Sequence, residues 1–280
     1  MTIRKAKRQE ARIRLALQGA SGTGKTYSAL QIASGMTSWD KICIIDTENN
    51  SADLYAHLGG FNVYPLKQPF TPERYIQALD DCEKSGMEVI IIDSMSHEWD
   101  GSGGILEYHA SLAGNSFTNW SKITPRHNAM IQRIMRSNAH VIATMRTRQD
   151  YVLSDKNGKM VPEKVGLKSI ARDGTDYEFT LVFDIDITHK CVASKDRTGM
   201  FADQPAFKPD AQTGKRIHEW CNEGEKVDLP YLIAACKNNQ ELKTLYSQCS
   251  QDQRVSYQSL FNQKHKDLTQ HVQSNGTYPH

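Results

Sequence analysis

The order of apolar and polar residues divides the chain into short apolar runs and into segments whose apolar residues recur at every third or fourth position. Short apolar runs are typical of strands in a sheet, and the longer spacing is typical of helices. The expected strands cover residues 13–17, 41–46, 87–93, 139–145 and 181–188. The expected helices cover residues 27–36, 51–58 and 71–85, and further helical segments reach residue 138. Strands that alternate with helices predict an α/β core, in which helices flank a mostly parallel twisted sheet.

The later part of the chain departs from this simple alternation. Residues 181–188 alternate between apolar and polar, which predicts a strand near the sheet edge, with residues 190–194 as its partner. The polar segment 150–176 contains a predicted hairpin that turns at Asn157-Gly158. Residues 205–225 are rich in turn-forming residues and predict a boundary. The expected organisation is a basic arm (1–14), an α/β core (10–220), a small helical appendage (225–272) and a disordered tail (273–280).

The turn between the first strand and the first helix has a pattern of its own. It consists of Gly19, Ala20, Ser21, Gly22, Thr23, Gly24, Lys25 and Thr26. Glycines let the backbone approach a phosphate, so that several N–H groups converge on the anion at a helix N-terminus. In such a loop the lysine reaches the β- and γ-phosphates and the hydroxyl can ligate Mg²⁺. The strand, turn and helix around this loop predict ATP and Mg²⁺ as cofactors, with Lys25 in a catalytic role.

Carboxylates follow two of the buried runs. Asp93 ends the run 87–93 and is a candidate to hold Mg²⁺ together with Thr26. Glu48 follows the run 41–46, and the carboxyl ends of parallel strands open on the same crevice. Glu48 is therefore a candidate base, or water-positioning residue, for attack on the γ-phosphate, but capping of the helix 51–58 is an equal alternative.

The segment after Asp93, residues 96–104, is expected to be flexible because it is rich in glycine. Glu98 could supply a second carboxylate to the site from this segment, and His97 could supply a polar contact. The alternative for both side chains is a structural role, in which they cap or satisfy a helix.

Positive charge is concentrated locally, although the formal net charge is only +2. Residues 2–14 hold six basic residues against Glu10, and this arm either binds a phosphate backbone or is a solvated, frayed terminus. Between residues 146 and 173 there are seven basic and four acidic residues. This segment predicts a single-stranded DNA contact, with a decorated surface loop as the alternative. The candidate DNA-binding residues are Arg146, Arg148, Lys156, Lys159, Lys164 and Lys168.

Arg146 has a second possible role, because it directly follows a strand whose carboxyl end meets the crevice. That position is suited to sensing a γ-phosphate and passing the signal into the segment that follows. Lys195 and Arg197 follow a later strand and are candidates to reach a nucleotide held by a neighbouring subunit. Solvated hairpin charge is the alternative for these two residues.

Six cysteines are scattered without a Cys-x-x-Cys pair, which predicts reduced, buried thiols and a cytoplasmic location. No signal peptide opens the chain, and no apolar run approaches the roughly 18 residues of a membrane span. No membrane partner is therefore expected.

Three motifs, in their order along the chain, resemble the RecA-like recombinase core. They are Gly19-x4-Gly24-Lys25-Thr26, Ile44-Ile45-Asp46-Thr47-Glu48 and Ile90-Ile91-Ile92-Asp93-Ser94. The resemblance covers about residues 10–205 and implies that Glu48 is the catalytic base. Lys195 and Arg197 resemble the paired lysines by which RecA subunits contact ATP across the filament interface. The chain is expected to lack RecA's larger N-terminal oligomerisation domain, and Met145-Arg146 stand in place of RecA's glutamine sensor.

The compact length and helical tail resemble the short phage-encoded RecA-like ATPases of single-strand annealing and recombination. This resemblance implies an Mg²⁺-dependent ATPase that couples its cycle to single-stranded DNA inside a bacterial host cell. It also implies a homo-oligomer with ATP at subunit interfaces, and a single-strand binding or annealing protein as a further partner. The alternative function is an ATP-gated interaction module, a loader or regulator of a replication or defence complex, in which the partner alone contacts DNA.

Overall fold

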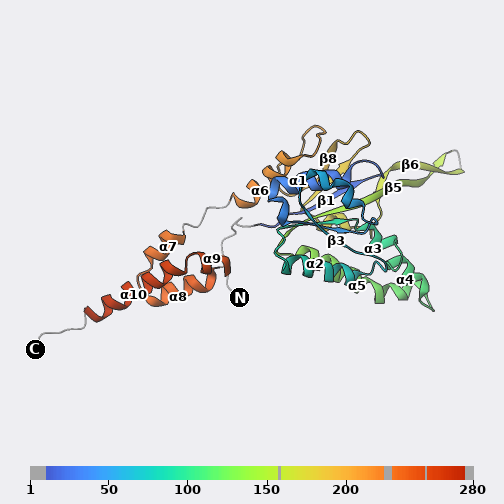
Figure 1. Cartoon of the computed structure of the whole chain (residues 1–280). Coiled ribbons are helices and arrows are strands. Elements are labelled where there is room, and N and C mark those ends of the chain that lie inside the picture. The colour runs from blue at the N-terminus through green and yellow to red at the C-terminus, as the bar shows by residue number, and fades with distance from the viewer. Residues whose placement is uncertain (1–10, 157–158, 224–228, 250, 275–280) are drawn as a thin grey trace, which may run out of the picture. The chain divides into compact units, whose positions relative to one another are not determined.

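The structure is a computed structural model of the 280-residue chain. It describes residues 11–156, 159–223, 229–249 and 251–274, with the side chains of 149–167, 252 and 270–274 excepted. The described residues fall into two compact units, a larger one that ends at Glu223 and a smaller one that begins at Leu229 (Figure 1).

The larger unit is built on an eight-stranded sheet. Its strands are β1 (Arg14–Gly19), β2 (Ile42–Asp46), β3 (Asn62–Pro65), β4 (Val89–Asp93), β5 (His140–Lys156), β6 (Lys159–Ser169), β7 (Leu181–Ile185) and β8 (Cys191–Asp196). The strand order is β3-β2-β4-β5-β1-β7-β8, with β6 paired to β5. In this order, the six strands β3, β2, β4, β5, β1 and β7 are parallel to one another. Strand β8 runs antiparallel to β7, and β6 runs antiparallel to β5. The mostly parallel α/β core expected from the sequence is confirmed.

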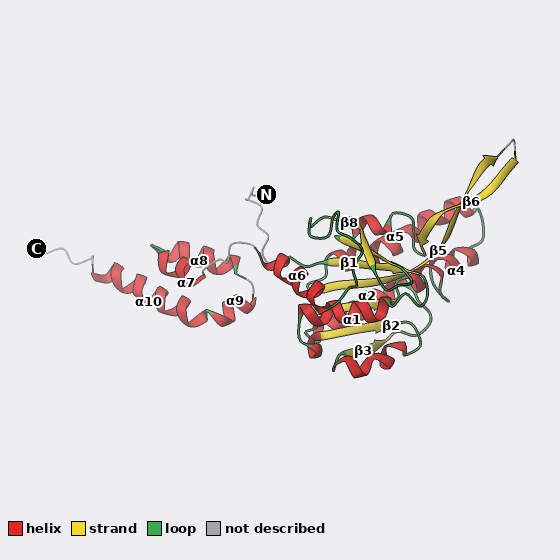
Figure 2. Ribbon diagram, turned by 90° about the horizontal axis from the view of Figure 1, so that it is seen from above, coloured by secondary structure: helices red, strands yellow, loops and turns green. Residues whose placement is uncertain are grey.

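Helices cover both faces of this sheet, as Figure 2 shows. Helices α1 (Lys25–Met36) and α6 (Ala211–Asn222) pack on one face, and α2 (Pro72–Lys84) and α5 (Ser116–Met135) pack on the other. Alternate residues of β2 therefore enter different cores, Ile44 facing α1 and Ile45 facing α2. Burial on both faces explains why β2 and β4 are almost continuously apolar in sequence.

The remaining short helices of the larger unit lie near the carboxyl edge of the sheet or connect its strands. They are α3 (Ser96–Asp100), α4 (Ile105–Ser111) and the 3₁₀ helices η1 (Trp39–Lys41), η2 (Ser51–Leu58) and η3 (Thr175–Glu178). The expectation of a flexible segment at residues 96–104 is wrong for its first half. Residues 96–100 form α3, and Ser96 and Glu98 are both buried there.

The division between the two units follows Glu223, within the boundary expected at residues 205–225, although much of this segment forms α6 rather than turns. Asp210 begins this helix with a capping box, in which its carboxylate accepts from Thr213 N while the Thr213 hydroxyl accepts from Asp210 N. The helix crosses α1 at very close range. A Cβ on Gly35 would lie 1.9 Å from the Ala211 carbonyl oxygen, so the glycine is required for this contact.

Strand β5 does not end at residue 145 but runs on without interruption as one arm of a hairpin. Arg148 is paired with Lys168 and Lys156 with Lys159, with a register shift between Asp150 and Tyr151. The hairpin is confirmed, while its predicted turn at Asn157-Gly158 lies outside the described residues. In Figure 1 the two strands project well beyond the sheet.

The smaller unit is helical, as the apolar spacing in this region predicts. It contains α7 (Leu229–Ala235), α8 (Asn239–Gln248), α9 (Gln251–Ser256) and α10 (Gln258–Ser274). Leu229, Ile233, Leu242 and Phe261 form the centre of its small core. Within the described part of the chain, none of the helices has both the length and the apolar character needed to cross a membrane. The predicted arm at residues 1–14 and the predicted tail at 273–280 fall mostly outside the described residues.

Candidate nucleotide-binding site

The loop between β1 and α1 has the backbone form that an anion site requires. Gly22 and Gly24 have φ values of +82° and +84°, in the left-handed region that glycine tolerates. The Thr23 hydroxyl donates to Ala20 O at 2.9 Å and closes the loop. Gly24 occupies the N-cap position of α1, and among the described side chains none caps this helix end. The N–H groups of the first turn are therefore available to a phosphate.

Lys25 lies at the start of α1 and turns back into the loop. Its Nζ donates to Gly19 O at 3.0 Å and to Ala20 O at 2.8 Å. Burial lowers the pKa of this lysine, and the nearby carboxylates of Asp93 and Glu48 partly oppose that effect. The ammonium is thus held close to the loop, where incoming phosphate oxygens can replace the two carbonyls as acceptors.

The carboxylate of Asp93, at the end of β4, is held by two hydroxyls. Thr26 Oγ1 donates to one oxygen at 2.6 Å and Thr144 Oγ1, from β5, donates to the other at 2.5 Å. Burial raises the pKa of Asp93, which is only 3% exposed. A hydroxyl and a carboxylate oxygen side by side are the hard ligands that Mg²⁺ prefers, and the cation would offset the cost of burying the charge. Thr26 and Asp93 therefore fit a magnesium ion.

The carboxylate of Asp46 holds the backbone around Glu48. Sequence analysis assigned no role to Asp46. Asp46 accepts from Glu48 N at 2.6 Å and from Ala52 N at 2.9 Å, so it is Asp46 that fixes the turn into η2. The Glu48 carboxylate instead accepts from Arg146. The Glu48 side chain therefore lies in the crevice, and Asp46 makes the contacts with the start of η2 that were the alternative for Glu48.

Arg146 and Glu48 form a forked ion pair across this crevice. Arg146 Nη2 lies 2.6 and 2.8 Å from the two Glu48 oxygens, and its Nε lies 3.1 Å from Oε1. The same Nη2 lies 2.6 Å from His97 Nε2. The side chains of Arg146 and Glu48 remain 36% and 29% exposed, so both are accessible from the crevice.

These residues line one continuous cavity of about 660 Å³. Its walls are formed by the phosphate loop and by side chains from five further segments. They are Ser21, Gly22, Gly24, Lys25, Thr26, Glu48, Ser51, Tyr55, Asp93, Arg146 and His189. The structure thus brings together Lys25, Thr26, Glu48 and Asp93, as expected from strands whose carboxyl ends meet at one edge.

The model of the AAA domain matches residues 11–217 of this chain. The chain belongs to the AAA domain family. This match and the loop geometry identify it as a P-loop ATPase, which binds nucleotide and ordinarily Mg²⁺. A comparison with curated proteins finds no match for this chain.

In this AAA domain the metal would be held by few protein ligands. The described residues contain no group of three or more His, Cys, Asp or Glu side chains that could hold a metal ion. Thr26 and Asp93 would therefore share Mg²⁺ with the phosphates and with water, as is usual for this cation. The bound metal would neutralise charge on the phosphates during transfer.

His189 was not found by sequence reasoning. It lies in the turn between β7 and β8, and its Nδ1 donates to Thr23 O at 3.0 Å. Three hydrogen bonds to the Asp186 carboxylate, from Thr188 N, Thr188 Oγ1 and Lys190 N, shape this turn. A histidine in an edge turn carries no motif, and only the packing of β7 beside β1 brings it to the loop.

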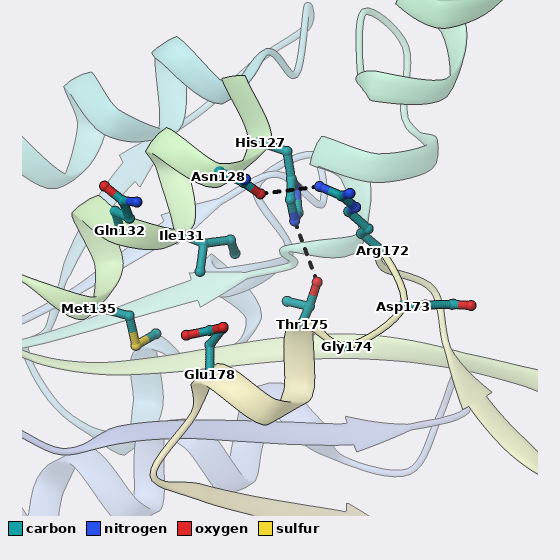
Figure 3. A pocket seen from close by; sticks show the side chains of 10 residues that line it. All are labelled: His127, Asn128, Ile131, Gln132, Met135, Arg172, Asp173, Gly174, Thr175 and Glu178. Carbon is teal, nitrogen blue, oxygen red and sulfur yellow. Dashed lines mark hydrogen bonds between the residues drawn. The ribbon is translucent and has the colours of Figure 1, made fainter. Parts of the chain in front are cut away.

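Glu98 lies outside the crevice, contrary to its possible role as a second carboxylate. It is 1% exposed, and its oxygens lie 3.0 and 3.1 Å from His127 Nδ1 on α5. Behind this pair is a second cavity, between α5 and residues 172–178 (Figure 3). His127 also contacts Thr175 there, at 3.5 Å. The structure thus gives Glu98 the structural role, in which it fastens α3 to α5.

The candidate DNA-binding residues do not form one group. Arg146 lines the nucleotide crevice, apart from the candidates on the hairpin, and its role in DNA binding stays a prediction. Arg148 is exposed near the hairpin root, and Lys168 forms an ion pair with Asp173 at 2.8 Å. The side chains of Lys156, Lys159 and Lys164 lie outside the described residues.

Lys195 and Arg197 do not line the crevice. Because β8 is antiparallel, Lys195 is level with Val182 and hence with Ala16, three residues before Gly19 on β1. Three strand residues span about 10 Å. Both side chains donate to the carbonyl oxygen of Tyr177, Arg197 at 3.1 Å.

Proposed function

We propose that this AAA-domain protein is a RecA-like ATPase, similar to the short phage-encoded enzymes of recombination and strand annealing, that couples ATP hydrolysis to single-stranded DNA binding. The observation that carries the proposal is the continuity of β5. This strand contributes Thr144 to the Asp93 carboxylate, Arg146 to the crevice and then one arm of the hairpin. A change at the γ-phosphate would therefore act directly at the hairpin root.

Each residue of the crevice has a defined part in hydrolysis. Lys25 and the loop amides bind the β- and γ-phosphates, while Thr26 and Asp93 hold the metal. Glu48 orients the attacking water and accepts its proton, because it is the one carboxylate of the cavity lining not committed to the metal. Glu48→Gln is expected to abolish hydrolysis while nucleotide binding persists.

The charge pattern of the hairpin supports a polyanion as its ligand. Two cross-strand pairs, Arg148 with Lys168 and Lys156 with Lys159, set positive residues opposite each other. Like charges in such positions destabilise a two-stranded ribbon. A phosphate backbone along the hairpin would remove this repulsion, and it would make the affinity strongly dependent on salt.

DNA affinity measured over a series of salt concentrations tests this coupling. A variant with Lys156, Lys159, Lys164 and Lys168 all changed to Gln is expected to reduce the salt slope by about 3 if each lysine contacts one phosphate of a single strand. The matched control changes four exposed lysines of the larger unit to Gln, namely Lys67, Lys84, Lys208 and Lys215. An unchanged slope in the hairpin variant would contradict DNA binding and favour the ATP-gated interaction module.

Lys195 and Arg197 are proposed to act on ATP bound by a neighbouring subunit. Their distance from their own crevice supports a role in trans over a role in cis. Mixing Lys195→Ala protein with Lys25→Ala protein should restore part of the activity, because some interfaces then combine an intact loop with an intact Lys195. Mixtures no more active than the separate variants would refute the trans role.

A further inference from the structure

We propose that Arg146 is a switch, which holds Glu48 inactive in the nucleotide-free protein and moves to the γ-phosphate when ATP binds, with His97 as its positioning residue. This inference rests on the proposed function, in which Glu48 activates water. Arg146 donates to both oxygens of Glu48 and therefore competes with a water molecule for this carboxylate. The forked pair is therefore an autoinhibited arrangement of the catalytic carboxylate.

His97 contacts the same guanidinium nitrogen, Nη2, that donates to Glu48, and it does so without adding charge. Burial and the neighbouring Arg146 lower the pKa of His97, while Glu48, Asp100 and Asp46 oppose this effect, so the ring is neutral near pH 7. Its Nε2 accepts from Arg146 at 2.6 Å, and its Nδ1 consequently donates to Thr47 Oγ1 at 2.7 Å.

The ring of His97 is also fixed in place. It stacks on Phe70 with the centroids 4.9 Å apart and the planes 17° apart. Thr47 is held in turn by Ser94 N, which donates to its hydroxyl at 2.8 Å. His97 is thus a fixed, uncharged acceptor for Arg146 Nη2, and it can keep this contact while the guanidinium exchanges the Glu48 oxygens for phosphate oxygens.

The backbone of Arg146 is held at the root of the hairpin. Its N–H donates to Ser96 Oγ at 2.9 Å, and Ile170 N donates to its carbonyl at 2.7 Å. Only the side chain is therefore free to change partner, within the cavity that Lys25 also lines. A γ-phosphate carries more negative charge than one carboxylate and offers the same forked geometry, so it competes for Arg146 and releases Glu48.

Equilibrium binding of ADP and of AMP-PNP, a non-hydrolysable ATP analogue, tests the switch, because only the analogue has a γ-phosphoryl group. Glu48→Gln removes the competitor for Arg146, so affinity for AMP-PNP should rise about tenfold, the equivalent of one charge-assisted hydrogen bond. ADP affinity should change less than twofold. Arg146→Gln should weaken AMP-PNP binding about tenfold and should abolish the gain from Glu48→Gln in the double variant.

The matched control is Glu73→Gln, which breaks a forked glutamate–arginine pair of the same kind outside the crevice. It should leave both affinities unchanged. His97→Phe removes the acceptor but keeps a stacked ring, and it should lower AMP-PNP affinity while ADP affinity stays constant; His97→Asn, which retains an acceptor, should restore part of the loss.

The outcomes separate the switch from the function on which it rests. Wild-type protein that binds neither nucleotide would refute the proposed function itself. Wild-type protein that binds both, with AMP-PNP affinity unchanged or reduced in Glu48→Gln, would overturn the switch and leave the ATPase proposal intact. If Glu48→Gln does not fold, additive effects in Arg146→Gln and Glu48→Ala proteins overturn it equally.

Discussion

Replacement of Lys25 by Met distinguishes the effect of this residue on the stability of the fold from its effect on nucleotide affinity. In the nucleotide-free protein the ammonium is partly buried against two carbonyl oxygens, and burial lowers its pKa. A lysine whose folded pKa lies below its unfolded value destabilises the fold at neutral pH. Lys25→Met keeps the length of the side chain and removes the charge. We expect the free energy of unfolding to stay within about 1 kcal/mol of wild type or to rise.

The effect on nucleotide binding should be much larger. When ATP is bound, Lys25 would make charge-assisted hydrogen bonds to the β- and γ-phosphates, each worth about 1.5–3 kcal/mol. The loss of both is at least about 3 kcal/mol, or roughly 150-fold in Kd.

Urea unfolding without nucleotide and equilibrium binding of AMP-PNP measure the two quantities, with Lys84→Met on the exposed face of α2 as the control. Destabilisation of Lys25→Met by more than about 2 kcal/mol, as for an ordinary buried group, would refute this reasoning. AMP-PNP affinity close to that of wild type would refute it as well.

Three further predictions concern stability. Gly35→Ala would place a Cβ 1.9 Å from a backbone oxygen of α6 and should lower the free energy of unfolding in urea by about 2–4 kcal/mol. The control Gly60→Ala has open space around it and should be nearly neutral. Equal stability of the two variants would contradict the α1–α6 contact. Asp196 is partly buried, which opposes ionisation, but hydrogen bonds from the following loop lower its pKa. Asp196→Asn should therefore cost about 1–3 kcal/mol at pH 7, and this difference should vanish as pH falls below the folded pKa. The Arg126 hydrogen bonds lower the pKa of Glu73 to about 2, so the contribution of this pair to the free energy of unfolding should be lost between about pH 4 and 2. Because the pair is exposed, it is worth at most about 1 kcal/mol, and a larger loss of stability in Glu73→Gln would contradict this prediction.

The core and the phosphate loop were predictable because their signals are local. A glycine-rich turn between a strand and a helix has few structural solutions, and parallel strands place Asp93 and Glu48 at the same edge as Lys25. The same rule brought Arg146 to this edge. It did not predict that Arg146 and Glu48, 98 positions apart, would bond to each other, because that contact depends on side-chain packing.

The parts that sequence reasoning missed depend on tertiary geometry. His189 reaches the loop only because β7 packs beside β1, and Glu98 turns away from the crevice because α3 is a helix that packs on α5. Helix α6 was obscured by the turn-forming residues before it, although Asp210 and Thr213 form a capping box that a search for helix starts could have found.

The central claim is that ATP hydrolysis and single-stranded DNA binding are coupled in this chain. The most direct test is the rate of Mg²⁺-dependent ATP hydrolysis, with and without single-stranded DNA, over a range of protein concentrations. The account predicts stimulation by DNA that rises more steeply than linearly with protein concentration, because the ATP sites would lie between subunits. Hydrolysis at the same rate with and without DNA, at every protein concentration, would contradict it.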